Sequence, residues 1–321
     1  MMNNFIEGTQ IITIIVISFG IIGNFLSVIV LKNKVMRSSV SIYLLALTLW
    51  DTVLLICALF IGPLMRFENL RVIFFKIFYP PALVAQTATI WITVGLTCER
   101  YFAVCFPLKA QFFISMKKSF WCVILISLFS IFYNVPRWLE EIPMSINNSE
   151  HTFVNHSDST IGFHKFYYSY AYIVIMFFIP LLVLSSMNYM LIRELKNSQL
   201  YVLNDTNKSL ISSKSRRIRS DNNVTRMIVV VVSIFIFCQF PALIYNIKFG
   251  IQPANDISWE IISEIRNFLV ILNSAVNFIL YCAFGQKFRR TFVHVIIPCN
   301  ENENVVNRRS LTNNVTNTML R

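Results

Sequence analysis

A glutamate and an arginine stand side by side at the end of an apolar stretch of the sequence. The segment "TCERYFAVCFPLKA" (97–110) places Glu99, Arg100 and Tyr101 directly after residues 80–98, which carry no charge. A guanidinium held by an adjacent carboxylate can be paired in one state and released to a partner in another, which is the chemistry of a two-state switch. The alternative is that both side chains only extend from a helix end to the interface with water. The following Tyr101 and "FPLKA" favour the switch.

One carboxylate, Asp51, lies in the middle of an apolar run. Burying an ionised side chain in a membrane costs at least about 2.5 kcal/mol, so this residue needs hydrogen-bond partners. Asn273 and Asn277 are four residues apart and therefore project from one face of a helix. We predict a polar cluster between helices that contains Asn24, Asp51, Thr89, Asn273, Ser274 and Asn277.

The elements that must position these residues are membrane helices. The chain of 321 residues is 55% hydrophobic and only 14% charged, whereas a soluble domain carries about 25% charged residues. Crossing a hydrocarbon core takes roughly 20 apolar residues in helical form, and a backbone in lipid has to satisfy its own hydrogen bonds. The predicted fold class is therefore an all-α membrane protein, a seven-transmembrane helix bundle. Its seven apolar runs are residues 11–31, 40–64, 80–98, 119–136, 166–192, 227–247 and 267–285.

The distribution of basic residues predicts which helix ends face the cytoplasm. With the N-terminus outside, 21 of the 28 lysines and arginines fall in cytoplasmic segments, and this bias sets the topology of membrane proteins. The net charge of +12 then follows from topology, and no nucleic-acid partner is needed. We expect a multi-pass protein of the plasma membrane. Its predicted parts are an extracellular tail (1–10), the bundle (11–285), an amphipathic membrane-surface helix (286–297) and a flexible cytoplasmic tail (298–321).

The segment after the seventh run has the pattern of a helix that lies on the inner leaflet. In "QKFRRTFVHVII" apolar side chains share one face and basic ones lie opposite, namely Phe288, Phe292 and Val295 against Lys287, Arg290 and His294. Each basic residue there contributes about 1 kcal/mol against anionic lipid. Membrane lipid is therefore an expected partner of this helix.

Three residues are candidates for covalent modification. Asn147 and Asn155 begin two glycosylation sequons in the predicted outer loop before the fifth run, where the acceptor sequence can be used. Cys299 follows the membrane-surface helix and could be palmitoylated, with an unmodified thiol as the alternative.

Each of the seven apolar runs also contains a short motif or a single residue that can be compared with known families, and these features follow one another along the chain. In chain order these are "GNFLSVIVL", "LALTLWD", "ERYFAVCFP", Trp121, Pro180, "CQFP" and "NFILY". The series covers essentially the whole chain and resembles that of the rhodopsin-like (class A) G-protein-coupled receptors. Within this class, "QTATIWITVGLTCERYFAVCFPLKA" and "LNSAVNFILYCAFGQKFRR" look most like the invertebrate FMRFamide-type neuropeptide receptors.

The resemblance implies roles for the residues named above. It implies that the Asp51 cluster binds an allosteric sodium ion, the alternative being a polar core that only fixes helix packing; no other cofactor is expected. It also implies a heterotrimeric G protein, and arrestin, as cytoplasmic partners. The switch toward the G protein would consist of Glu99, Arg100, Tyr101, Asn277 and Tyr281.

Several positions depart from the pattern of the class. Phe75 stands where most members have a cysteine bonded to the second extracellular loop, and that loop has no cysteine either. Gln239 replaces the usual tryptophan of the sixth helix, and Phe278 the usual proline of the seventh. Pro241 can still kink the sixth helix by removing a backbone hydrogen bond, so we expect a hinge at Gln239 and Pro241.

The ligand class is narrowed by positions that such receptors use for other ligands. Amine receptors of the class have an aspartate where this chain has Ala82, and opsins have a lysine where it has Ile271. The outer segments hold nine acidic against seven basic residues. Together with this acidic face, the resemblance to FMRFamide-type receptors implies a short amidated peptide that ends in Arg-Phe-amide, whose arginine would seek a carboxylate in a partly dry pocket. The candidates are Glu260 and Glu264, then Glu140 and Glu141; the alternative is that all four are solvated rim residues.

Other function classes fit the residues less well. A channel or transporter needs charged or broken helices along a route, and one midplane carboxylate without internal repeats argues against it. No metal-ligand spacing, nucleophile–base pair or glycine-rich phosphate loop indicates an enzyme. Within receptors, the alternative is an orphan chemosensory receptor or one for a lipid.

Overall fold

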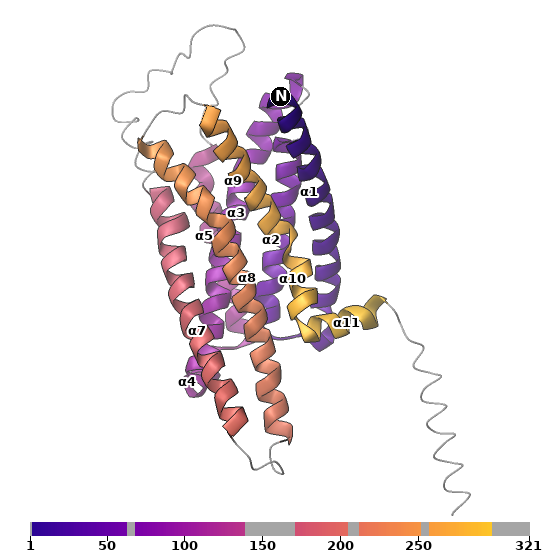
Figure 1. The fold of residues 1–321 in the computed structure, drawn as a ribbon, viewed down its shortest axis with the longest axis vertical. Helices are drawn as coiled ribbons and strands as arrows, with labels where there is room; N and C mark the ends of the chain where they lie inside the picture. Colours follow the sequence, from indigo (N-terminus) through magenta and orange to yellow (C-terminus); the bar gives the residue numbers. More distant parts are fainter. Residues whose placement is uncertain (1, 63–67, 139–170, 205–211, 252–256, 297–321) are drawn as a thin grey trace, which may run out of the picture.

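The protein is a bundle of long helices whose axes run roughly along one direction (Figure 1). The computed structural model describes residues 2–62, 68–138, 171–204, 212–251 and 257–296. Six helices in these ranges are long and apolar enough to cross a membrane, and a bent pair makes a seventh span. The predicted seven-transmembrane helical fold is therefore confirmed. The spans are formed by α1 (Met2–Lys32), α2 (Ser39–Ile61), α3 (Glu68–Cys105), α5 (Met116–Asn134), α7 (Ile179–Asn204), α8 (Ser212–Ile251) and the pair α9 (Ile257–Ala275) and α10 (Asn277–Phe284).

Shorter elements connect or extend these spans. A 3-10 turn η1 (Lys34–Met36) lies between α1 and α2, and α4 (Pro107–Phe113) lies between α3 and α5. A second 3-10 turn, η3 (Val135–Trp138), extends α5, and a π-helical turn, η5 (Val174–Phe178), precedes α7. The wide turn comes just before Pro180, whose missing N–H removes one rung of the regular helical hydrogen bonding.

Two helix starts differ from the ranges expected from the sequence. The predicted tail 1–10 is helical from Met2 and continuous with α1. α3 begins at Glu68 and runs through Pro80 and Pro81, where the apolar run was expected to begin. Membrane helices tolerate interior prolines because their neighbours satisfy the freed backbone groups. Glu99 and Arg100 consequently lie inside α3, more than one turn before it ends at Cys105.

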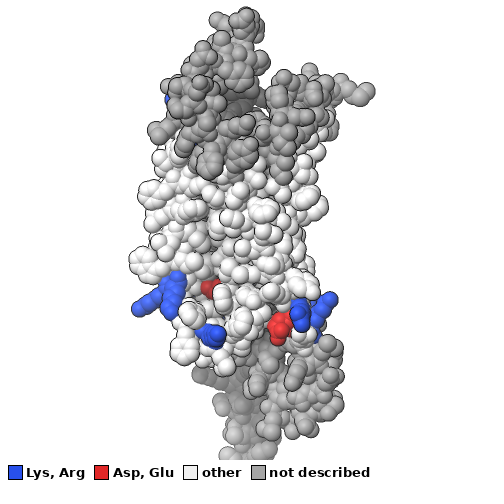
Figure 2. All heavy atoms as spheres, turned by 90° about the vertical axis from the view of Figure 1, so that its left-hand side faces the viewer, with Lys and Arg blue, Asp and Glu red and all other residues white. Residues whose placement is uncertain are grey.

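Basic side chains gather at one end of the bundle, which we call the basic end. Figure 1 places the N-terminus at the opposite end from α4 and α11 (Gln286–Ile296). On the face drawn in Figure 2, most of the visible lysines and arginines form a belt near one end, and the middle of the bundle shows no charged side chain. From the end of α1 to the start of α5, the exposed cations of the basic end are Lys32, Lys34, Arg37, Lys109, Lys117 and Lys118, whereas the exposed Lys76 of α3 lies toward the opposite end. That the basic end faces the cytoplasm stays a prediction.

Aromatic contacts hold α11 against the bundle. Phe288 of α11 is 2% exposed and lies 5.5 Å from the ring centre of Tyr281. Phe292 lies 5.4 Å from Phe278 in an edge-to-face arrangement, which aromatic pairs favour. Lys287 on the other side is exposed. The helix therefore has the apolar and basic faces that its sequence pattern predicts.

The seventh span is bent without a proline. α9 and α10 meet at Val276 with an angle of 45°. Two glycines of α1 lie against this bend: a Cβ at Gly20 would come within 2.7 Å of the Ala275 Cβ, and a Cβ at Gly23 within 2.9 Å of the Phe278 Cβ. Since real Cβ atoms essentially never come under 3.0 Å, only glycine lets α1 approach the bent span so closely.

The end of α3 opposite the basic end is packed against α2 by phenylalanines. Phe60 of α2 stacks on Phe78 of α3 at 4.2 Å and meets Phe74 edge-on at 5.7 Å. Phe75, at the position where a cysteine is usual, stacks on Tyr79 at 4.5 Å. The six cysteines in the described part of the chain are all free thiols. Ring packing thus joins α2 and α3 here.

Candidate functional site

Asp51 is the centre of a buried polar cluster, which we call the hub. Its side chain is fully buried, and three donors from other helices point at its carboxylate. Oδ1 accepts hydrogen bonds from Thr89 of α3 at 3.1 Å and from Ser274 of α9 at 2.8 Å. Oδ2 accepts one from the amide of Asn277 of α10 at 2.6 Å. The hub therefore ties α2 to α3 and to both halves of the bent span.

Asn24 of α1 joins the hub from the other side. Its amide nitrogen donates to the backbone oxygen of Ser274 at 3.3 Å, while its Oδ1 is buried with no hydrogen-bond partner among the described residues. Asn273 was predicted to belong to the same cluster. It is buried, but none of the three bonds to Asp51 comes from it. Its neighbour Ser274 occupies that position, because consecutive residues of a helix point in different directions.

The hub contains the kind of ligand atoms that a hard cation binds. Such ions take oxygen ligands, and the Asp51 carboxylate, the Thr89 and Ser274 hydroxyls and the unpartnered Asn24 Oδ1 are all oxygen atoms. An orphaned buried carbonyl oxygen otherwise costs about 1–3 kcal/mol. These residues therefore fit a sodium ion, which would supply a positive charge beside Asp51 when bound. The alternative, a polar core that only joins helices, uses the same hydrogen bonds.

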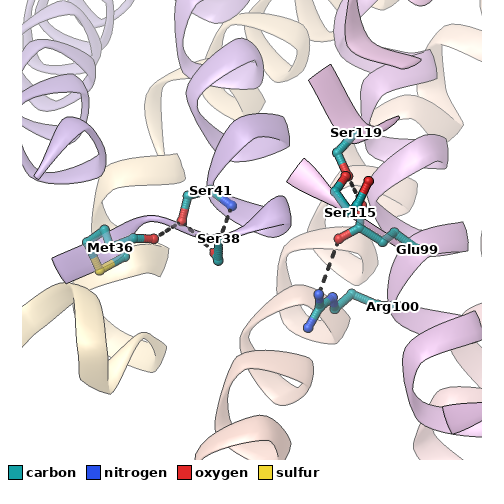
Figure 3. Close-up of polar contacts among 7 residues, drawn as sticks. All are labelled: Met36, Ser38, Ser41, Glu99, Arg100, Ser115 and Ser119. Atoms are coloured by element: carbon teal, nitrogen blue, oxygen red, sulfur yellow. Dashed lines mark hydrogen bonds and ion pairs between the residues drawn. The ribbon is translucent and has the colours of Figure 1, made fainter. Parts of the chain in front are cut away.

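A second polar group lies at the basic end, where α3 meets α5. The Glu99 carboxylate is 6% exposed and forms an ion pair with Arg100 at 3.3 Å. Its other oxygen, Oε2, accepts a hydrogen bond from the hydroxyl of Ser119 at 2.6 Å. Figure 3 shows the two contacts on opposite oxygens of the same carboxylate. We call Ser119, Glu99 and Arg100 the lock.

Tyr101, Asn277 and Tyr281 were predicted to form the switch together with Glu99 and Arg100. The Tyr101 ring is half-buried and packs edge-on against Phe106 at the start of α4. Tyr281 is fully buried and lines a cavity of about 1160 Å³ at the basic end, together with Arg100. Asn277, the third member from the seventh span, faces Asp51. The structure thus places Tyr281 at the cavity with Arg100, and Asn277 in the hub.

Several cationic side chains line the wall of this cavity. Arg100, Lys287, Arg289 and Arg290 line it, and the lining residues that the structure describes include no aspartate or glutamate. At its wall, Asn223 of α8 donates a hydrogen bond to Gln286 of α11 at 2.9 Å. A partner segment that enters between α2, α3, α8 and α11 would therefore meet several positive charges and gain most if it were acidic.

The predicted hinge lies in α8. Pro241 stands inside this continuous helix, and Gln239 is 4% exposed with its Oε1 lacking a hydrogen-bond partner in the described part of the chain. Nearer the basic end, the Asn188 amide of α7 donates to the hydroxyl of Ser233 at 3.2 Å. Asn188 therefore links α7 to α8 on the basic-end side of Pro241.

The predicted ligand and modification residues lie mostly outside the described residues. Glu140, Glu141, Asn147, Asn155 and Cys299 all do so. Glu260 is in the first turns of α9, and Glu264 is exposed on the same helix.

Some connections were not predicted from the sequence. Besides Ser119 and Asn188, the indole of Trp50 donates to the hydroxyl of Ser127 at 3.1 Å and joins α2 to α5. Trp121, which supported the resemblance as the fourth-helix residue, is 62% exposed. The one usable signal for Ser119 was its spacing of four from Ser115, which puts two hydroxyls on one face at the start of a helix.

Comparisons with known proteins agree with this geometry. The family model "7 transmembrane receptor (rhodopsin family)" matches residues 23–281. The FMRFamide receptor of Drosophila melanogaster is 30% identical over 294 residues, which are 85% of this chain and 51% of that protein. The FMRFamide peptide receptor frpr-18 of Caenorhabditis elegans is 27% identical over 88% of this chain and 68% of its own length. The thyrotropin-releasing hormone receptor of Gallus gallus is 26% identical over 88% and 77%, respectively. The chain thus spans about half the length of the Drosophila relative.

Proposed function

Because this chain belongs to the rhodopsin family of seven-transmembrane receptors, we propose that it is a plasma-membrane receptor for a short amidated peptide ending in Arg-Phe-amide. In this proposal the N-terminus is extracellular and the basic end faces a heterotrimeric G protein. The observation that carries it is the 30% identity to an FMRFamide receptor over 85% of the chain. A second relative is named for an FMRFamide peptide.

The charges of the predicted outer segments support a cationic, C-terminally blocked ligand. Nine acidic residues stand there against seven basic ones, and the described part shows one of those cations in use: the Arg137 guanidinium lies 5.4 Å over the Tyr172 ring. Glu264 is exposed on α9, so its carboxylate is accessible to a peptide arginine. An amidated phenylalanine needs an aromatic or apolar wall, and the paired rings of Phe60 and Phe74 between α2 and α3 are our candidate for it.

Signal transfer would run from the hub to the lock. Asp51 holds both halves of the bent span through Ser274 and Asn277. A shift of α10 would therefore change the hub and also move Tyr281 in the wall of the cavity. Release of Arg100 from Glu99 would then present the guanidinium to the G protein, with the cavity accepting its segment.

The direct test is a screen of amidated peptides on cells that express this chain, with cyclic AMP and calcium read together. Arg-Phe-amide peptides should activate, and their free-acid forms should be much weaker. Activation by hydrophobic extracts alone, with no response to amidated peptides, would replace the proposal with a lipid or chemosensory receptor. Ion flux in cells that lack G proteins would indicate a channel or transporter.

A second experiment tests the arginine contact. Glutamine is placed singly at each candidate carboxylate, with Glu68→Gln at the start of α3 as the control. If one carboxylate pairs with the arginine, its replacement should cost about 2–5 kcal/mol of peptide affinity, and a citrulline peptide should lose far less on that variant than on the parent. Unchanged affinity in all four variants would leave the carboxylates as solvated rim residues. The four candidates are Glu260, Glu264, Glu140 and Glu141.

A further inference from the structure

We propose that Ser119 of α5 is a positioning residue of the switch: its hydroxyl fixes the Glu99 carboxylate, and the fixed carboxylate restrains Arg100. The inference rests on the proposed signalling function and adds to it an anchor on a different helix. Ser119 is 3% exposed and lies in the first turns of α5. Nothing in the sequence pattern had assigned it a role.

The two contacts of the carboxylate differ in strength. A hydroxyl bonded to a carboxylate is strongest at about 2.5–2.7 Å, and a guanidinium bonded to one at about 2.7–2.9 Å. The Ser119 contact, at 2.6 Å, is at its best distance, whereas the contact from Arg100 Nη2, at 3.3 Å, is longer than the best distance for a guanidinium. The position of the carboxylate is therefore set mainly by α5, and the arginine is the more weakly bound of these two partners of Glu99.

The Ser119 hydroxyl has two acceptors within reach, the Ser115 carbonyl and the Glu99 carboxylate, and the carboxylate is the stronger acceptor. A serine inside a helix usually bonds the carbonyl four residues back, which here is that of Ser115, at 3.1 Å. The hydroxyl has one proton, and the charged acceptor at 2.6 Å outcompetes the neutral one at 3.1 Å. The Ser115 carbonyl also accepts the Ser119 backbone N–H at 2.9 Å, so it is not left without a donor.

The start of α5 makes this anchor rigid. Ser115 caps the helix by accepting a hydrogen bond from the Lys118 backbone N–H at 3.3 Å, which satisfies one of the free donors of the first turn. Ser119 follows one turn later on the same face. The partial positive charge at a helix N-terminus also favours the nearby carboxylate of Glu99. The lock is consequently built on two helices, α3 and α5, as Figure 3 shows.

Ser119→Ala removes the donor and leaves Glu99 Oε2 buried without it. A flexible, buried carboxylate then turns toward water at the basic end and loosens its hold on Arg100. Since hydrogen bonds to charged groups are among the stronger ones, signalling without peptide should rise about tenfold per receptor at the cell surface.

The experiment compares peptide-free signalling of variants, normalised to surface expression and read on a panel of G-protein sensors. Ser119→Ala should raise the signal and Ser119→Thr, which keeps the hydroxyl, should restore the parent level. Ser130→Ala is the matched control, because Ser130 is fully buried on the same helix and, among the described residues, its hydroxyl bonds the Ile126 carbonyl of α5 at 2.8 Å and no side chain of another helix. It should signal like the parent. Glu99→Ala should also raise the signal, and adding Ser119→Ala to it should have no further effect.

Each outcome either supports or refutes the role of Ser119 as an anchor of Glu99. If Glu99→Ala raises the signal and Ser119→Ala does not, the anchor is refuted while the proposed switch survives. If neither variant changes the signal, both are refuted. A fall in Ser119→Ala would mean that the serine competes with Arg100, and additivity with Glu99→Ala would mean that it acts elsewhere; either overturns the inference. Should Ser119→Ala reach the surface poorly, Ser119→Cys, with similar volume and a weak donor, should give an intermediate rise, and parent-level signalling would refute the anchor.

Discussion

Replacement of Asp51 by asparagine separates the charge of the hub from its hydrogen bonds. The asparagine can turn its oxygen toward the Asn277 amide and its NH2 group toward Thr89 and Ser274, whose hydroxyls also act as acceptors. All three contacts of 2.6–3.1 Å thus keep a donor and an acceptor. The variant loses the negative charge and retains the network.

The expected change in stability is small because two effects oppose each other. A hydrogen bond to a charged group contributes about 1.5–3 kcal/mol and a neutral one about 0.5–1.5 kcal/mol. Three weakened bonds therefore cost about 3 kcal/mol, and removing a carboxylate from the membrane interior recovers at least about 2.5 kcal/mol. Asp51→Asn should fold like the parent. Asp51→Ala instead leaves the buried Asn277 amide without its acceptor and should lose about 1–3 kcal/mol.

The sodium response is where Asp51→Asn should differ from the parent. At a sodium concentration ~5 times the dissociation constant, binding stabilises the folded receptor by about 1 kcal/mol. The assay is thermal unfolding of the purified receptor in sodium chloride and in choline chloride at equal ionic strength, followed by agonist affinity in both salts. The parent should respond to sodium and Asp51→Asn should not. An equal response of both proteins would refute the ion site and leave a hub that only joins helices.

Three further variants test other contacts. Arg100→Ala should keep surface expression and peptide binding and lose most of the G-protein signal; normal signalling at normal expression would mean that the side chain only reaches the interface. Gly20→Val should destabilise the purified receptor by about 1–3 kcal/mol through overpacking, since its Cβ would lie 2.8 Å from the Ala275 backbone; an unchanged unfolding temperature contradicts this. Asn188→Ala should raise peptide-free signalling, because it removes the 3.2 Å bond to Ser233 of α8; a parent-level signal would show that this bond does not restrain α8.

The hub was predictable from the sequence because depth in a membrane limits the choice of partners. A buried carboxylate needs donors, and Asn24, Thr89, Ser274 and Asn277 were the polar side chains at similar positions along other spans. The rotation of each helix about its axis was not predictable. For that reason both Asn273 and Ser274 were expected at Asp51, and of these two Ser274 makes the contact.

The anchor of the lock could not be found in the same way. Serine is common in membrane helices and usually bonds its own helix, as Ser130 does here. Only the approach of α5 to α3 distinguishes Ser119 from it. Similarly, the sequence indicated only that Phe278 replaces the usual proline of the seventh helix and did not predict the bend at Val276, which the space over Gly20 and Gly23 allows.

The close contact between α1 and the bent span gives the bundle an uneven stiffness. Where Gly20 meets Ala275, backbone lies against backbone, and close-packed atoms yield little when pushed. On the other side, α8 packs through side chains, among them Ile228 and Val232, and the neutral amide contacts from Asn188 and Asn223 add about 1 kcal/mol each. A force on such a bundle displaces the side that is held more loosely, whichever helix the force acts on. We therefore expect that a ligand that touches only α9 displaces α8 without contacting it.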